Sequence, residues 1–123
     1  MSARVGNITF DCDDALVVGN FWSQVIGRPL DPGGSSGFCS IGISDPEREQ
    51  SAWLFEKVPE SKTSKNRVHL DLLDPDPTAV DRLVALGASI VAEHEVGDGS
   101  HRWTVLRDPE GNELCISTDS YVG

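Results

Sequence analysis

The strongest constraint on the fold is an internal repeat of two strand-like segments, offset by 60 positions. Polar and apolar residues alternate in residues 8–12 and again in residues 67–72. At the two-residue period of a strand, the later segment places His69 and Asp71 on one face and its apolar residues on the other. One face of each segment therefore belongs to a core, and the opposite face lines a wetter space.

The two segments also match position by position. Thr9 stands where His69 stands, and Asp11 stands where Asp71 stands. Each segment is followed at the same distance by a glycine that can end a helix. These glycines are Gly27 and Gly87.

A helical pattern and further strands follow each segment. Asp13 or Asp14 can cap the first helix, and Asp76 can cap a second helix over residues 77–86, with Pro77 at its first position. The expected inward stripes are Val18, Phe21, Trp22 and Val25, then Val80, Leu83 and Val84. The further strands are expected at residues 38–43 and 51–58, then 89–93, 102–107 and 113–118.

The repeat predicts a single α+β domain over residues 1–123, built from two βαβββ modules. Module one covers about residues 7–58, a polar linker covers 59–66, and module two covers about 67–118. One module alone leaves a sheet face without a partner, so two modules or two chains must pack together.

Charge and apolar patterning exclude several classes of protein. The chain has 20 Asp and Glu against 10 Lys and Arg, a formal charge of −10, which repels nucleic acid and anionic membrane surfaces. It has no apolar run long enough for a membrane span or a signal peptide, so a cytoplasmic location is expected. The three cysteines lie far apart and indicate neither a disulfide framework nor a structural zinc site.

Three motifs carry a resemblance to a known superfamily. They are Phe-Trp-x-x-Val-Ile-Gly at residues 21–27, Val-His-Leu-Asp at 68–71 and Asp-Pro-Glu-Gly-Asn-Glu at 108–113. With the repeat, they make the chain resemble the vicinal-oxygen-chelate superfamily, and more narrowly the glyoxalase-like proteins related to glyoxalase I and the bleomycin-resistance proteins. The resemblance covers about residues 8–116 and is more specific for the fold than for a reaction.

The resemblance implies a curled mixed sheet that forms a cup, with metal ligands on the first and last strands of each module. The family's histidine in the second module falls on His69, and its counterpart in the first module falls on Thr9. The glutamate that the family supplies on the last strand falls on Cys115, and its counterpart falls on Glu56 or, with a shift of one, Phe55. The expected cofactor is therefore either none or a divalent metal held by His69, Glu56 and Cys115.

His69, Asp71 and Asp11 are the candidate catalytic residues. His69 is either a proton carrier and ligand in the cup or a structural histidine bonded to Asp71 or Arg67. Asp11 and Asp71 either approach each other as an acid–base pair or hold neighbouring strands.

The candidate ligand-binding residues line the expected cup. Trp53 and Phe55 alternate with Leu54 and Glu56, so either the aromatic pair or the other pair faces the ligand. Arg67 is the best placed of a small cationic group. The full set is Thr9, Trp53, Phe55, Arg67, Trp103 and Cys115.

Three functions fit this pattern, and all of them involve a small organic molecule. The first is a binding or lyase/isomerase-like protein that works without a tightly held metal through His69, Asp71 or Asp11. The second is a metal-dependent lyase, isomerase or dioxygenase. The third is a protein of the drug-resistance kind that sequesters its ligand unchanged. A homodimer is expected in each case.

Overall fold

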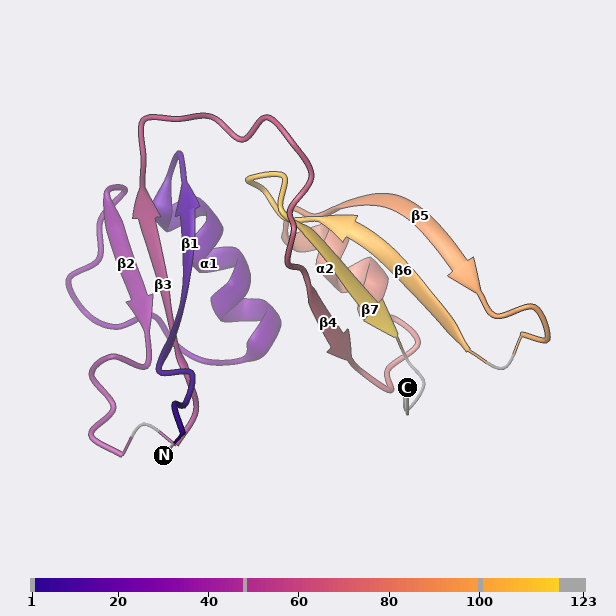
Figure 1. Ribbon diagram of the computed structural model, residues 1–123, viewed down its shortest axis with the longest axis horizontal. Coiled ribbons are helices and arrows are strands. Elements are labelled where there is room, and N and C mark those ends of the chain that lie inside the picture. Colours follow the sequence, from indigo (N-terminus) through magenta and orange to yellow (C-terminus); the bar gives the residue numbers. More distant parts are fainter. Residues whose placement is uncertain (1, 48, 100, 118–123) are drawn as a thin grey trace. The chain divides into compact units, whose positions relative to one another are not determined.

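The computed structural model describes residues 2–47, 49–99 and 101–117, and the chain divides into two compact units, Met1–Lys62 and Thr63–Gly123 (Figure 1). Each unit combines a mixed sheet with one helix, which confirms the α+β class. Among the described residues, no helix has both the length and the apolar character needed to cross a membrane.

The first unit contains β1 (Asn7–Cys12), α1 (Ala15–Ile26), β2 (Phe38–Ile41) and β3 (Ala52–Lys57). Its strand order is β1-β3-β2, with β1 parallel and β2 antiparallel to β3. At the place where the repeat predicts another strand, the described chain makes a single bridge between Leu30 and Ile41.

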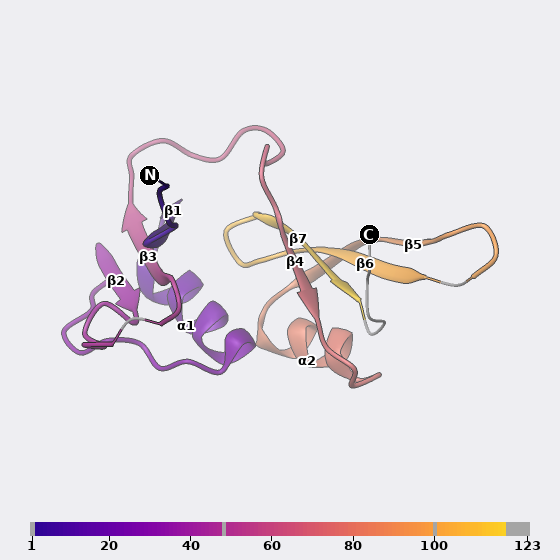
Figure 2. The same cartoon turned by 60° about the horizontal axis from the view of Figure 1, so that its bottom comes forward.

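Helix α1 begins and ends where its capping residues predict. The Asp14 carboxylate accepts hydrogen bonds from the backbone N–H groups of Leu16 at 3.0 Å and Val17 at 3.2 Å. Gly27 ends the helix in the left-handed conformation, with φ at 69°. Asp14, rather than Asp13, is therefore the cap, and its helix covers one face of the sheet (Figures 1 and 2).

An aromatic cluster forms the core of the first unit between α1 and the sheet. The rings of Phe10 and Phe55 have centroids 5.3 Å apart, and Trp22 lies 5.3 Å from Trp53. Phe55 is fully buried and Trp22 is 1% exposed. Burying rings of this size is the main source of stability in a small core.

The second unit contains β4 (Leu70–Leu73), α2 (Ala79–Leu86), β5 (Ser89–Glu95), β6 (Arg102–Arg107) and β7 (Glu113–Ser117). Its strand order is β4-β7-β6-β5, with β4 parallel to β7 and the other pairs antiparallel. This unit has the complete βαβββ order. Strand β4 begins two residues later than predicted, and Val68, expected in the core, is 79% exposed.

Helix α2 begins later than the sequence predicts. Thr78 occupies the N-cap position, and the Asp76 carboxylate accepts from the Thr78 N–H and hydroxyl in the turn before the helix. The inward face also differs from the predicted one: Leu83 is buried as predicted, but Val84 is 42% exposed and Ala79 is buried. Figure 2 shows α2 on one side of the four-stranded sheet.

Asp108 shapes the turn that leads into β7. Its buried carboxylate accepts hydrogen bonds from the backbone N–H groups of Glu110 and Asn112, both at 2.9 Å, and from the Asn112 side-chain amide at 3.0 Å. Gly111 has a φ of 86°, which favours glycine. The turn sets the start of β7, and with it the side of the sheet to which Cys115 points.

Candidate functional site

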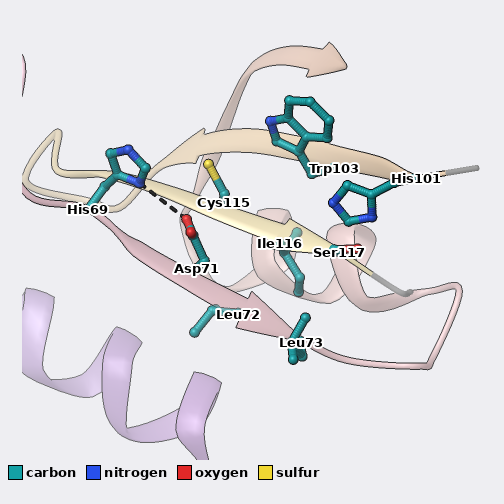
Figure 3. A pocket seen from close by; sticks show the side chains of 9 residues that line it. All are labelled: His69, Asp71, Leu72, Leu73, His101, Trp103, Cys115, Ile116 and Ser117. Atoms are coloured by element: carbon teal, nitrogen blue, oxygen red, sulfur yellow. Dashed lines mark hydrogen bonds and ion pairs between the residues drawn. The ribbon is translucent and has the colours of Figure 1, made fainter. Parts of the chain in front are cut away.

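A pocket of about 410 Å³ lies on the second unit, on the side of the sheet to which Asp71, Cys115 and Trp103 project (Figure 3). Its size falls within the range of small-molecule sites. The residues that line it come from β4, β6, β7 and the segments just before β4 and β6. They are His69, Asp71, Leu72, Leu73, His101, Trp103, Cys115, Ile116 and Ser117.

His69 and Asp71 form a pair at the start of β4. His69 Nδ1 lies 3.2 Å from Asp71 Oδ1, and the two side chains are 42% and 69% exposed. At this exposure an ion pair contributes little to stability. The contact instead orients the imidazole. It also selects a tautomer: the carboxylate accepts from Nδ1–H, which leaves Nε2 as the nitrogen that can accept a proton.

Cys115 lies directly across from Asp71, since the two residues are partners in the parallel β4–β7 register. Burial raises the pKa of the Cys115 thiol above its usual value, and the negative charge and hydrogen bond of Asp71 raise it further, while the charge of Lys65 opposes them. The thiol is therefore protonated at neutral pH. In this state it is a weak donor rather than a nucleophile.

The side chains of His69, Asp71 and Cys115 each offer one metal-binding atom, and these atoms all lie within 4.8 Å of one another. Imidazole, carboxylate and thiolate together suit a divalent cation such as Zn²⁺, with three protein ligands and an open fourth position. The residues thus fit a metal, and all three come from the second unit.

Two imidazole rings stack on the indole of Trp103, which lines the pocket. Its ring centroid lies 5.3 Å from that of His101, at 23° between planes, and 5.3 Å from that of His94, at 24°. His94 is the partner of Trp103 in the β5–β6 register. His94 reaches Trp103 through the strand register, whereas His101 lies two residues before Trp103 on the segment that leads into β6.

The remaining predicted site residues lie outside this pocket. Arg67 is exposed and precedes β4. Thr9 and Asp11 lie on the exposed face of β1 in the first unit. Trp53 is half-buried against Phe10, with ring centroids 5.7 Å apart.

The registers decide between Glu56 and Phe55 as the counterpart of Cys115. Asp11 is the partner of Glu56 across β1–β3, as Asp71 is the partner of Cys115 across β4–β7. Glu56 is exposed, whereas Phe55 is fully buried in the aromatic core. Asp71 is the donor that sequence reasoning did not count as a ligand, although its spacing of two from His69 already placed both on one strand face.

The chain contains two units that each combine a helix with a mixed sheet, and Asp71 and Cys115 lie on the first and last strands of the complete unit. These features define a protein of the glyoxalase, bleomycin-resistance and dioxygenase fold. The family model of the glyoxalase-like domain matches residues 7–117 of the sequence. The chain therefore belongs to this family. The predicted family is thus confirmed.

Solved structures agree with this assignment. A glyoxalase/bleomycin resistance protein/dioxygenase family enzyme from Burkholderia phytofirmans is 25% identical, with a TM-score of 0.67 and coverage of 94% of this chain and 98% of that chain. The fosfomycin resistance protein FosX from Listeria monocytogenes, complexed with Mn(II) and a dihydroxypropylphosphonic acid, is 14% identical, with a TM-score of 0.73 and coverage of 98% and 93%.

A lactoylglutathione lyase from Agrobacterium tumefaciens is also 14% identical, with a TM-score of 0.58 and coverage of 95% and 94%. At this identity the FosX and lyase structures support the fold alone. No curated protein matches the chain.

Proposed function

We propose that this glyoxalase-like protein binds a small organic molecule in the pocket of the second unit and acts on it as a lyase or isomerase through proton transfer by His69. The observation that carries the proposal is the 3.2 Å contact between His69 Nδ1 and Asp71 Oδ1 at the rim of this pocket. A base that is oriented by a carboxylate is an arrangement suited to general acid–base catalysis.

In this proposal each residue has a defined part. His69 Nε2 takes a proton from a ligand C–H bond next to a carbonyl group, and the electron pair of that bond moves into the enolate. Asp71 accepts from Nδ1–H throughout and stabilises the imidazolium that forms. The same nitrogen then returns the proton to the same carbon, which exchanges it. With an α-hydroxy carbonyl ligand the enolate is an enediolate: a proton moves from the α-hydroxyl oxygen to the former carbonyl oxygen, His69 returns its proton to the former carbonyl carbon, and the ligand is isomerised.

The test is deuterium incorporation from D₂O into a panel of carbon acids, including α-hydroxyketones and 1,3-diketones, followed by proton NMR. We expect at least one compound to exchange faster with the protein, and His69→Gln to reduce its rate by about 10²-fold or more. Asp71→Asn should cause a smaller loss, and Glu56→Gln, an exposed carboxylate of the first unit, is the matched control. A panel without exchange, or exchange that survives His69→Gln, overturns the proposal.

A second candidate is a metal-dependent lyase, isomerase or dioxygenase, and the convergence of three donor atoms within 4.8 Å favours it. His69, Asp71 and Cys115 would hold the ion, which would act as a Lewis acid toward an oxygen of the small molecule. In that case His69 is a ligand rather than the base. In the first candidate His69 binds a proton taken from the small molecule, and in the second it binds the metal ion.

Titration with Co²⁺ separates these candidates, because a cobalt–thiolate bond gives a charge-transfer absorption in the near ultraviolet. Metal binding predicts this absorption in the wild type and its loss in Cys115→Ser. Asp71→Asn should weaken binding, whereas Glu56→Gln should do so only if the first unit supplies a ligand. Absence of the band at one equivalent of Co²⁺ would eliminate the metal-dependent candidate.

We also infer that the protein assembles as a homodimer. Closed symmetric dimers are the commonest assemblies of soluble proteins, and exposed apolar side chains on the second unit are available for such a contact. They include Val68, Leu73, Val84, Ile90, Val91 and Val96. Sedimentation equilibrium should give twice the chain mass, and Ile90→Lys should reduce it to the monomer.

A further inference from the structure

We propose that the pocket selects a planar conjugated ring, and that Trp103 and His101 form the platform on which the ring lies. This inference rests on the proposed small-molecule function and names the class of ligand. It holds for either candidate chemistry, because neither residue belongs to the His69, Asp71 and Cys115 cluster.

Both platform residues line the pocket and already stack on each other. Their ring centroids are 5.3 Å apart with 23° between planes, the offset geometry that aromatic rings prefer. An imidazole is smaller than an indole, so an offset contact covers only part of the larger ring. Trp103 keeps partial exposure, and both side chains present surface to the pocket (Figure 3).

His94 holds the platform from the neighbouring strand. It pairs with Trp103 across β5–β6 and stacks on it at 5.3 Å, but it does not line the pocket. Trp103 is thus fixed by one imidazole before a ligand arrives, and a side chain that is already ordered loses less conformational entropy on binding. The arrangement favours a flat, rigid ligand over a flexible chain.

The reacting groups lie at another part of the same pocket. His69 precedes β4, whereas Trp103 lies on β6, and β7 with Cys115 runs between these two strands. A ligand whose ring rests on the platform can therefore extend its functional group along β7 toward His69. The division assigns recognition to β6 and chemistry to β4.

The test uses 2-naphthoate and its saturated analogue decalin-2-carboxylate, which share charge and approximate size but differ in planarity. Calorimetric titration of the full chain should show that 2-naphthoate binds about 3- to 10-fold more tightly, the range expected for aromatic stacking. Trp103→Leu should remove this preference, Trp103→Phe should retain most of it, and His94→Gln should reduce it partly. Circular dichroism checks that each variant is folded.

Equal affinity for the two probes, or a preference that survives Trp103→Leu, overturns the inference. Loss of the preference in Trp53→Phe instead of Trp103→Leu also overturns it, because Trp53 belongs to the aromatic core of the first unit. His69→Gln distinguishes the two proposals: it should abolish deuterium exchange and leave the ring preference intact. Failure of one measurement alone therefore identifies which proposal is wrong.

Discussion

Asp71 lies directly opposite Cys115 in the parallel β4–β7 pair, and its carboxylate is placed to act on both Cys115 and His69. A single carboxylate thus adds to the effect of burial in raising the pKa of a thiol, and it also contacts an imidazole. Its substitution should change both properties at once.

Asp71→Asn should make Cys115 more reactive toward iodoacetamide. Burial raises the pKa of the Cys115 thiol, and Asp71 raises it further through its charge and hydrogen bond, so removing the charge lowers the pKa and increases the thiolate fraction. We expect a several-fold faster alkylation at pH 8, measured by peptide mass spectrometry. Cys39, whose buried thiol donates to the Ala15 carbonyl at 3.1 Å, is the internal control. An unchanged alkylation rate would contradict the role of Asp71.

Metal binding at this cluster should strengthen as pH rises. The pKa of Cys115 lies above its usual value, so the thiol must lose its proton before it can bind the ion. Zn²⁺ binding should therefore release a proton, detectable as a dependence of the calorimetric heat on the ionisation enthalpy of the buffer. Cys115→Ser should remove this dependence. A heat independent of the buffer in the wild type would show that the thiol is not a ligand.

Phe55→Ala and Glu56→Ala should differ strongly in their effect on stability. Phe55 is fully buried in the aromatic core, so its truncation leaves a cavity and should lower the free energy of unfolding by about 3–5 kcal/mol. Glu56 is exposed and its truncation should cost less than about 0.5 kcal/mol. Urea denaturation measures both. Similar losses at the two positions would mean that the assigned faces of β3 are wrong.

Asp31→Asn should destabilise the protein at neutral pH but not in acid. Burial works to raise the pKa of Asp31, yet hydrogen bonds from Ser44, Ser40 and the Ile43 N–H outweigh it and the pKa is lowered. A lowered pKa contributes stability above the unfolded value, and this contribution is lost as pH falls through the folded value. The variant should therefore lose about 1–2 kcal/mol at pH 7 and little in acid, once the pH lies below the folded pKa.

Chemical denaturation at the two pH values provides the measurement for Asp31. Asp81→Asn, at an exposed carboxylate in the first turn of α2, is the control. An equal loss at both pH values would show that the charge of Asp31 is not the cause.

Alternation, apolar stripes and capping residues were enough to predict both helices and most strands, because these patterns depend on neighbouring residues. The fold family came from the resemblance of three motifs to known proteins. The capping pattern gave the wrong start for α2, where Thr78 rather than Asp76 is at the N-cap position, and the buried residues are Ala79 and Leu83. The pattern also could not show that Val68 lies outside β4, since burial depends on how far the partner strand extends.

The site was harder to predict than the fold. The sequence predicted His69 and Cys115 as metal ligands in the expected cup. The convergence of Asp71 with them depends on the β4–β7 register. The contact of His94 with Trp103 depends on β5–β6 pairing, which includes a register shift between Ile90 and Ala92. Pairing between strands is a property of the folded chain that no local pattern contains.

The exposure of the His69–Asp71 pair has a consequence for how this protein can change over generations. Side chains that are 42% and 69% exposed contribute little to stability, while the first unit keeps a buried aromatic core that does not depend on them. Substitutions at the two positions therefore carry little risk of unfolding. Selection can therefore alter the chemistry of the pocket at His69 and Asp71 while the scaffold stays constant.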